Sequence, residues 1–359
     1  MKPVPGILNI SPYVAGRSEA PGRGPVYKLS SNETPFGAAR DAIEAFTAAA
    51  AGLNLYPDGS ARAMRQAIAE THGLEADRII CGNGSDEILH LLPQIYAGPG
   101  DEILFSAHGF LVYPIATLAA GATPVVVPEP DLRTDVDGFL RHATDRTRIA
   151  FLANPNNPTG SFNTAAELRR LRAGLPEECL LVVDAAYAEY VDAEGYDTGA
   201  ALVAATPNTV MTRTFSKVYG LAALRVGWAY APAGVVDAYE RVRGPFNVSA
   251  PAQAAAVAAV KNEAHVAAGK AHNTRWRNWL AAEIAALGLK VHPSVANFIL
   301  VGFDRTGPRT AAAADAFLAS RGVVVRAVSS YGLPHCLRIS VGTEEGNRAA
   351  VAALAEFMA

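Results

Sequence analysis

Residues 149–160 read IAFLANPNNPTG, a short apolar run that ends in a polar turn with two prolines. An amphipathic segment follows at Ala165–Ala173, and a second apolar run lies at Leu180–Val183. Short apolar runs bounded by Asn and Pro are typical of buried strands, and the segment between them has the period of a helix. Because strands that alternate with helices build parallel sheets, this stretch predicts an α/β fold.

The same alternation recurs on both sides of this unit. Further helix candidates lie at Ser85–Ala97 and Val235–Arg243. The strand candidates are Arg78–Cys81, Glu102–Phe105, Pro124–Val127, Ile149–Ala153, Leu180–Val183, Thr209–Thr214 and Val226–Ala231. We therefore expect a largely parallel central sheet with helices around it.

The pattern changes from about Pro251. A long Ala-rich helical stretch runs to about Leu287. Short strand candidates at Phe298–Val301, Val323–Arg326 and Leu337–Val341 then precede a last helix at Glu345–Met358. The chain is predicted to divide into an N-terminal arm that forms part of a small domain (1–45), a large domain (46–270) and a small C-terminal α+β domain (271–359).

The composition excludes several classes of function. A net charge of -3 and a pI near 6.3 give no basic face for a nucleic acid. Longer apolar segments such as Leu118–Val127 are interrupted by Gly121 and Pro124, so none reaches the roughly 20 residues that cross a bilayer. The cysteines are few and far apart, which predicts neither disulfides nor a metal site: Cys81, Cys179 and Cys336. We expect a cytoplasmic protein without a nucleic-acid or membrane partner.

Four polar segments follow apolar runs directly, and in a parallel sheet ligands bind at the carboxyl ends of the strands. The first is the glycine turn Gly82–Gly84, after which a helix N-terminus at Ser85 and Asp86 could bind an anion. The same two residues would also serve as ordinary helix caps. The second, Asn154–Gly160, offers amides that hydrogen-bond a ligand, or that only build a turn.

The other two segments carry the ionisable groups. Asp184 ends an apolar run, where its carboxylate would need a cation such as a pyridinium N–H, or would cap the next helix. Lys217 could form a Schiff base with an aldehyde, although a lone lysine is usually a solvated charge. Hydroxyl and guanidinium donors suited to a phosphate surround it in the sequence: Thr214, Ser216 and Arg225. Together the four segments predict a site for pyridoxal 5′-phosphate (PLP).

With these motifs the chain resembles the fold-type I PLP-dependent aminotransferases, and is similar to their histidinol-phosphate aminotransferase subgroup. The matching motifs span nearly the whole chain: Ser31–Gly37, Leu55–Asp58, Gly84–Glu87, Asn154–Gly160, Thr214–Lys217, Leu224–Gly227 and Leu337–Gly342. The resemblance implies the PLP-dependent transferase fold, with a mostly parallel seven-stranded sheet in the large domain. It also implies a homodimer with shared active sites.

The resemblance assigns a role to each matching residue. Lys217 binds the cofactor and carries the proton, Asp184 pairs with the pyridine nitrogen, and Asn157 and Tyr187 contact the ring hydroxyl. The phosphate is held by Ser85, Asp86, Thr214, Ser216 and Arg225. Phe110 lies against the ring, and Tyr56 crosses to the phosphate from the partner subunit. The substrate contacts are Arg338, Arg326, Tyr13 and Asn32.

The chain departs from many relatives at Phe110, where they have Tyr, and at Ala185, where they have an acidic residue. A packed aromatic remains an alternative for Tyr13, as does a surface ion pair for Arg326.

The subgroup implies transfer of the amino group of L-histidinol phosphate to 2-oxoglutarate, which gives imidazole acetol phosphate and L-glutamate in histidine biosynthesis. An aromatic amino-acid aminotransferase would use nearly the same residues, because Arg338 binds a carboxylate as readily as a phosphate. In a PLP-dependent decarboxylase or lyase, Arg338 would retain the carboxylate that must leave. A non-catalytic PLP-binding regulator would need a DNA-binding segment, and the roughly thirty residues before Asn32 are too few for one.

Overall fold

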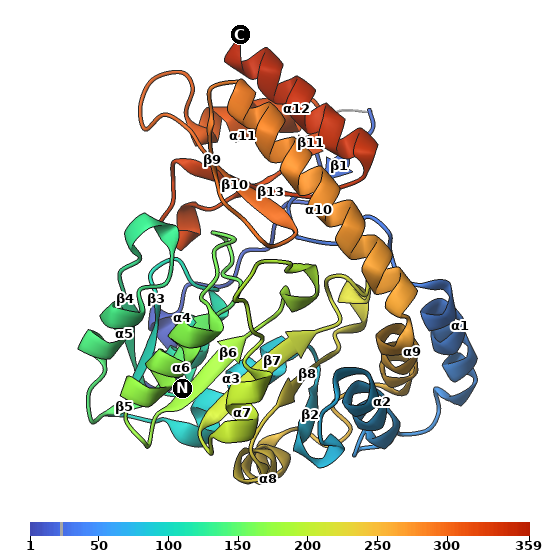
Figure 1. The fold of residues 1–359 in the computed structure, drawn as a ribbon, viewed down its shortest axis with the longest axis vertical. Helices are drawn as coiled ribbons and strands as arrows, with labels where there is room; N and C mark the ends of the chain where they lie inside the picture. Colours follow the sequence, from blue (N-terminus) through green and yellow to red (C-terminus); the bar gives the residue numbers. More distant parts are fainter. Residues whose placement is uncertain (22–23) are drawn as a thin grey trace.

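The computed structural model describes residues 1–21 and 24–359, and Figure 1 shows a larger lobe below a smaller one. A seven-stranded sheet of order β2-β8-β7-β6-β5-β3-β4 crosses the larger lobe. Its strands are β2 (Ile79–Gly82), β3 (Glu102–Ser106), β4 (Thr123–Val127), β5 (Thr147–Ala153), β6 (Leu180–Asp184), β7 (Thr209–Thr214) and β8 (Gly227–Tyr230). Only β8 runs antiparallel to its neighbours, so the predicted fold class is confirmed.

Helices cover both faces of this sheet. They are α2 (Arg62–His72), α3 (Ser85–Tyr96), α4 (Val112–Ala119), α5 (Val136–His142), α6 (Ala165–Gly174), α7 (Ala200–Ala205) and α8 (Ala233–Val242). In β3, Ile103 packs in the core beneath α3, α4 and α8, while Leu104 packs in the opposite core beneath α5 and α6. Since both faces are buried, the strands read as continuous apolar runs, which is why the sequence revealed them.

The smaller lobe is built on a four-stranded sheet of order β12-β13-β10-β9. Its strands are β9 (Lys290–His292), β10 (Phe298–Gly302), β12 (Arg326–Ala327) and β13 (Cys336–Ser340), and a separate parallel pair joins β1 (Tyr27–Lys28) to β11 (Val323–Val324). Its helices are α10 (Glu263–Ala286), α11 (Ala311–Ser320) and α12 (Glu344–Met358). The β1–β11 pair places the N-terminal segment against the C-terminal part of the chain.

The structure corrects the expected elements in three places. The long Ala-rich stretch forms two helices, α9 (Ala250–Lys261) and α10, because Asn262 leaves helical geometry and its side chain accepts the backbone N–H of His265 at 2.9 Å. The expected strand Val323–Arg326 splits into β11 and β12, which pair with different strands. The sequence analysis named no element at α1 (Arg40–Ala49), α2, α4, α5, α7, α11, β1 or β9. Strands of two or three residues are too short for alternation to show.

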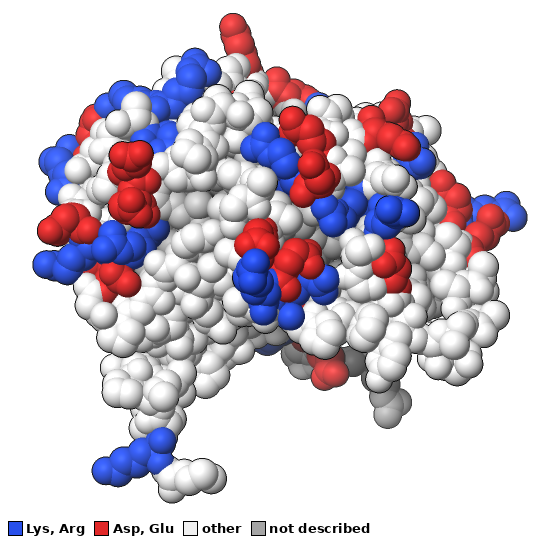
Figure 2. All heavy atoms as spheres, turned by 90° about the horizontal axis from the view of Figure 1, so that it is seen from below, with Lys and Arg blue, Asp and Glu red and all other residues white. Residues whose placement is uncertain are grey.

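Short 3-10 helices complete the described chain: Ile7–Asn9, Ala50–Gly52, Ala76–Arg78, Pro130–Leu132, Ala188–Tyr190, Ala222–Leu224 and Ser329–Tyr331. On the face shown in Figure 2, acidic and basic side chains stand in mixed groups between uncharged areas. Within the described ranges, no helix is both long and apolar enough to span a membrane.

Candidate active site

A cavity of about 300 Å³ opens where several strands of the large sheet end. Asp184 is the last residue of β6 and Thr214 the last of β7, while Ser85 opens α3 directly after β2. The cavity brings together every site residue expected from the sequence except Tyr56: Tyr13, Asn32, Ser85, Asp86, Phe110, Asn157, Asp184, Tyr187, Thr214, Ser216, Lys217, Arg225, Arg326 and Arg338. The strand ends of the large sheet gather one part of this set, as is usual in α/β proteins, while the N-terminal segment and the small sheet supply Tyr13, Asn32, Arg326 and Arg338.

Asp184 is buried beneath this cavity and accepts two side-chain hydrogen bonds. The Tyr113 hydroxyl donates to Oδ2 at 2.9 Å, and the Thr212 hydroxyl donates to Oδ1 at 3.0 Å. Burial raises the pKa of Asp184 to about 6, although both hydrogen bonds act to lower it. A cationic partner in the cavity would remove the cost of burying this carboxylate.

The sequence analysis did not identify Tyr113 or Thr212. Thr212 lies two residues before Thr214 on β7, so strand alternation places both side chains on one face and could have revealed it. Tyr113 lies in the first turn of α4, and its ring meets Phe110 edge-on at 5.9 Å between centroids. The sequence around Tyr113 is apolar and does not indicate that its hydroxyl binds Asp184.

Lys217 extends into the same cavity. Its Nζ lies 5.4 Å from the centre of the Tyr187 ring, and the Tyr187 hydroxyl accepts a hydrogen bond from Asn32 Nδ2 at 2.9 Å. Burial, and then the positive charge of Arg338, lowers the pKa of Lys217 to about 8. A substantial fraction of this amine is therefore neutral near physiological pH, as a nucleophile or a proton acceptor requires.

An anion cradle lies at the other end of the cavity. Arg225 donates to Asp86 Oδ2 at 3.0 Å and to the Ser216 hydroxyl at 3.3 Å, and the Ser216 backbone N–H donates to Thr214 Oγ1 at 3.1 Å. The guanidinium passes so close to Gly84 that a Cβ there would lie 2.7 Å from Arg225 Nη2. Glycine at this turn thus lets a cation reach the N-terminus of α3, where free N–H groups favour an anion.

Arg338 lies on β13, across the cavity from the large sheet. One guanidinium nitrogen donates to Asn157 Oδ1 and another donates to the Ser30 carbonyl at 2.7 Å. The buried Nε has no hydrogen-bond partner within the described chain. An unpaired buried donor of this kind is costly, so the side chain is suited to receive an anion from the cavity.

Asn32 fixes the N-terminal arm to the small lobe. Its φ of 57° lies in the left-handed region, which asparagine tolerates better than most residues. Its backbone N–H donates to the Ser340 hydroxyl at 2.9 Å, and that hydroxyl donates back to Asn32 Oδ1 at 2.8 Å. Asn297 Nδ2 binds the Asn32 carbonyl at 2.9 Å. These contacts hold the amide that binds Tyr187.

Tyr13 and Arg326 lie at the mouth of the cavity. The guanidinium carbon of Arg326 is 5.9 Å from the centre of the Tyr13 ring, and its Nη2 donates to the Val14 carbonyl at 2.7 Å. Arg326 is buried, whereas the Tyr13 side chain is 49% exposed.

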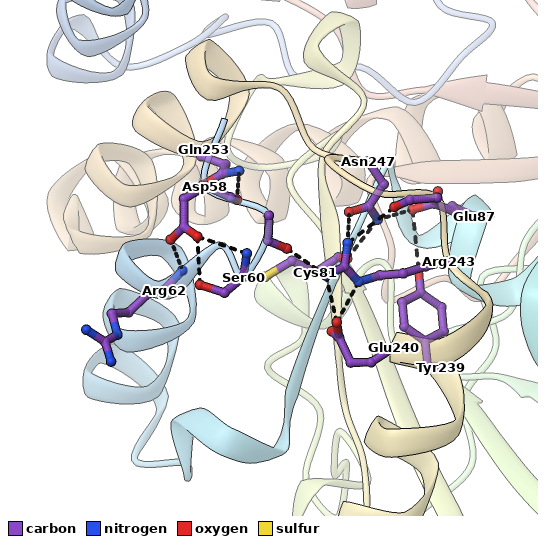
Figure 3. Close-up of polar contacts among 12 residues, drawn as sticks. Asp58, Ser60, Arg62, Cys81, Glu87, Tyr239, Glu240, Arg243, Asn247 and Gln253 are labelled. Atoms are coloured by element: carbon purple, nitrogen blue, oxygen red, sulfur yellow. Dashed lines mark hydrogen bonds and ion pairs between the residues drawn. The ribbon is translucent and has the colours of Figure 1, made fainter. Parts of the chain in front are cut away.

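Tyr56 lies outside the cavity. It is 83% exposed and stacks on Phe246 with 4.7 Å between ring centroids. Figure 3 shows how its loop is held: Gln253 donates to the Asp58 carbonyl at 2.9 Å, and Arg243 donates to the Gly59 carbonyl at 2.6 Å. The loop is therefore ordered although its apolar side chains face solvent.

The same network reaches the anion cradle. Asn247, next to Phe246, donates to Glu87 Oε2 at 2.6 Å, and Glu87 also accepts the Asn83 backbone N–H at 2.7 Å (Figure 3). Glu87 is in the first turn of α3, the helix that begins at Ser85. The exposed aromatic pair and the cradle are thus parts of one connected framework.

The sequence is similar to those of a known protein family. The profile of the family "Aminotransferase class I and II" matches residues 25–354. The chain is 57% identical over 358 residues to a protein of Rhodopseudomonas palustris strain HaA2 named histidinol-phosphate aminotransferase, covering 99% of this chain and 98% of that protein. A protein of the same name from Nitrobacter hamburgensis is 54% identical with the same coverage.

Solved structures of aminotransferases are similar to this chain in fold. The histidinol-phosphate aminotransferase of Sinorhizobium meliloti in complex with pyridoxal-5′-phosphate superposes with a TM-score of 0.87 at 29% identity, covering 93% of this chain and 91% of that one. An aspartate aminotransferase of Thermus thermophilus with maleate reaches 0.83 at 25% identity, covering 93% and 92%.

Proposed function

This chain belongs to the aminotransferase class I and II family, and on that premise we propose that it is a PLP-dependent transaminase acting on L-histidinol phosphate. It would move the amino group to 2-oxoglutarate, yielding imidazole acetol phosphate and L-glutamate in histidine biosynthesis. The observation that carries the proposal is a single cavity in which a buried carboxylate (Asp184), a lysine with a lowered pKa (Lys217) and an arginine with an unpaired donor (Arg338) meet.

The donor set of the cavity fits PLP. When bound, PLP supplies an electron sink that weakens the bonds at the substrate's amino-bearing carbon. Asp184 would pair with its ring nitrogen, which supplies the cation that this buried carboxylate lacks. Lys217 would hold its aldehyde carbon. Asp184 ends β6, and Lys217 lies just past the end of the neighbouring strand β7. The sheet therefore fixes the separation of these two residues.

The remaining cofactor contacts follow from the cavity lining. The anion cradle would hold the phosphate through backbone N–H groups at Ser85 and Asp86, where α3 begins, and through the side chains of Thr214, Ser216 and Arg225. Phe110 would cover one face of the ring, and its edge-on packing against Tyr113 supports that orientation. Asn157 and Tyr187 would bind the ring hydroxyl, each already tied to a second residue, Arg338 and Asn32 respectively.

Lys217 is the group that would move the proton. Once its Nζ is free, the neutral amine could take a proton from the substrate's amino-bearing carbon and deliver it to the cofactor. The lowered pKa leaves part of the amine neutral near physiological pH, so that it can accept this proton. The Tyr187 ring restricts where the amine can move.

Arg338 would bind the anionic end of each substrate. Histidinol phosphate presents a phosphate and 2-oxoglutarate presents carboxylates, and a guanidinium can bind both with paired hydrogen bonds. Asn32, Arg326 and Tyr13 would complete this side of the site. The aromatic amino-acid alternative is not favoured, since the curated relatives that match the full chain at 54–57% identity carry the histidinol-phosphate name.

We further propose a homodimer in which Tyr56 reaches the phosphate of the partner subunit. Support comes from the exposed apolar side chains around it: Leu53 at 70%, Leu55 at 69% and Phe246 at 43% exposed. Apolar groups gathered in this way favour association. Light scattering should give a dimer mass for the wild type and a larger monomer fraction for Leu55→Glu, with Leu8→Glu, at another exposed apolar site, as control. The cytoplasmic location stays a prediction from the sequence.

The decisive experiment is a single-turnover half-reaction of the purified PLP form. The cofactor absorbance would be followed after addition of L-histidinol phosphate, L-phenylalanine or L-glutamate in turn. Fast conversion by histidinol phosphate and glutamate, with phenylalanine far slower, is the expected result. Conversion by phenylalanine but not by histidinol phosphate would contradict the proposed substrate while leaving the transaminase assignment intact.

A further inference from the structure

A second group of basic side chains lies at the edge of the small lobe, away from the active site. Two cavities of about 360 and 450 Å³ adjoin there, and they share no lining residue with the active-site cavity. We call this region the basic groove, lined by Lys290, His292, Arg305 and His335 in both cavities, with Arg309 in one and His108 in the other.

The charges of the basic groove are not balanced. Among the ion pairs of the described chain, none involves Lys290, Arg305 or Arg309. The one carboxylate among the described residues that line the groove is Asp304. Elsewhere on the same lobe, Arg348 is matched with Glu344 at 2.9 Å. The groove therefore has an excess of positive charge.

The pKa values of the two histidines are lowered in this groove. Burial lowers the pKa of His292, and the charges of Lys290 and His335 lower it further. Burial likewise lowers the pKa of His335, with added repulsion from Arg305, His108 and Lys290. These groups are therefore close enough to repel one another, and a bound anion would reverse that repulsion.

A glycine lies beside two of the basic residues of the groove. Gly302 pairs with Lys290 across β10 and β9, and a Cβ there would lie 3.6 Å from Lys290 Cβ and 3.7 Å from His292 Nε2. A side chain at this position would therefore pack against both residues within the groove. Glycine weakens a strand and often marks a place where a ligand approaches the backbone closely.

We propose that the basic groove binds a phosphate group, as a site separate from the active site. Lysine and arginine supply the charged donors that phosphate prefers, and the two histidines add donors when they take up protons. The groove also lies at the junction of the lobes, because His108, two residues before Phe110, contacts the Tyr331 carbonyl through Nδ1 at 2.7 Å.

The test is isothermal titration of the PLP-loaded enzyme with inorganic phosphate. Phosphate can also enter the active site, so Arg338→Ala serves to remove that contribution. Binding should persist in Arg338→Ala and weaken by about tenfold or more in Lys290→Ala/Arg305→Ala, which removes two charge-assisted contacts. The double variant should keep wild-type turnover. Arg321→Ala/Arg348→Ala, which removes two exposed arginines of the same lobe, is the matched control and should bind as the wild type does.

Two results would overturn the proposal: unchanged phosphate affinity in the Lys290/Arg305 double variant, or loss of all binding in Arg338→Ala. Repeating the titration with glycerol 3-phosphate identifies the source, since tighter binding of the ester indicates a phosphorylated metabolite and equal binding indicates free phosphate.

Proton uptake gives a second readout. The charged groups that face His292 and His335 are Lys290, Arg305, Arg309, His108 and Asp304. A phosphate would raise the pKa of both histidines, while the phosphate itself, whose second pKa lies near neutral, releases protons as the site favours its dianion. The net proton uptake near neutral pH, seen as a binding enthalpy that depends on the buffer, should therefore be larger in the wild type than in His292→Gln/His335→Gln. Equal proton uptake in the two proteins would contradict the proposal.

Discussion

The two walls of the active-site cavity are built differently. The sheet wall, formed by Asp184, Thr214 and Lys217, comes from strand ends whose positions are set by the register of the seven-stranded sheet. Both carboxylate oxygens of Asp184 already have donors. The arm wall, formed by Tyr13, Arg326 and Arg338, comes from the N-terminal arm and short strands. It contains a half-exposed tyrosine and an arginine with an unpaired Nε.

This difference indicates that the two walls bind different groups. The sheet wall is complete without a substrate, as a site for a permanently bound group should be, because prearranged donors lose little entropy on binding. The arm wall keeps a guanidinium with an unused N–H, which can donate to the phosphate of one substrate and to the carboxylate of the next. Substitutions in the two walls should therefore have different effects, on the chemistry in the sheet wall and on substrate choice in the arm wall.

Lys217→Ala should have the largest effect. Loss of the group that we propose holds the cofactor and moves the proton should reduce turnover by about 10²–10⁴-fold or more, with the fold retained. Steady-state kinetics and circular dichroism would measure both. Lys261→Ala, an exposed lysine paired with Glu70, is the control and should match the wild type. Wild-type turnover by Lys217→Ala would remove the chemistry from the sheet wall.

Arg338→Ala, a substitution in the arm wall, should have the second-largest effect on activity. Loss of a charge-assisted contact should cost about 1.5–3 kcal/mol, or roughly 10–150-fold in kcat/KM, for histidinol phosphate and glutamate alike. Arg338→Lys keeps the charge but not the paired geometry and should recover part of the loss. If kcat/KM were unchanged for every donor, Arg338 would not belong to the substrate site.

Asp184 should make the cofactor-free protein sensitive to pH. Its folded pKa of about 6 lies above the ordinary value of about 3.8 for an aspartate, so the folded chain keeps a proton that the unfolded chain releases. Stability from this group is therefore present below about pH 4 and is lost as the pH rises through about 6, by up to about 3 kcal/mol. Urea unfolding between about pH 4 and about pH 7 should show a loss larger by about 2 kcal/mol in the wild type than in Asp184→Asn. Equal losses would show that Asp184 is not strained by burial.

Tyr113→Phe should have the smallest effect. It removes one donor to Asp184 without changing the packing of the ring, which should cost about 1 kcal/mol in transition-state stabilisation, or about fivefold in kcat. The pH at which activity is lost on the acid side should also rise, because the hydrogen bond lowers the pKa of Asp184. Thr117→Val, also in α4, removes a hydroxyl that bonds only to the Tyr113 carbonyl at 2.7 Å and leaves Asp184 untouched as a control. An unchanged acid limb in Tyr113→Phe would mean that Tyr113 does not act through Asp184.

The same contrast explains what the sequence could predict. Strands such as β6 are apolar on both faces and end in a polar residue, so Asp184 and Lys217 could be located from local pattern, and the family and fold class are confirmed. Tyr113 and Ser340 escaped notice because their partners, Asp184 and Asn32, lie 71 and 308 residues away. The pairing of β1 with β11 likewise joins residues that lie far apart in the sequence. Whether Tyr56 completes the site of a second subunit depends on an interface that lies outside a single chain.

The most direct test of the sheet wall is to trap the cofactor on the chain. Borohydride reduction of the PLP-loaded enzyme makes the link between a lysine and the cofactor's aldehyde permanent, and peptide mapping by mass spectrometry then locates it. We predict that the modified peptide contains Lys217 and that the Lys217→Ala variant yields none. A label on any other lysine, or an unlabelled Lys217 in an enzyme that turns over, would contradict the account.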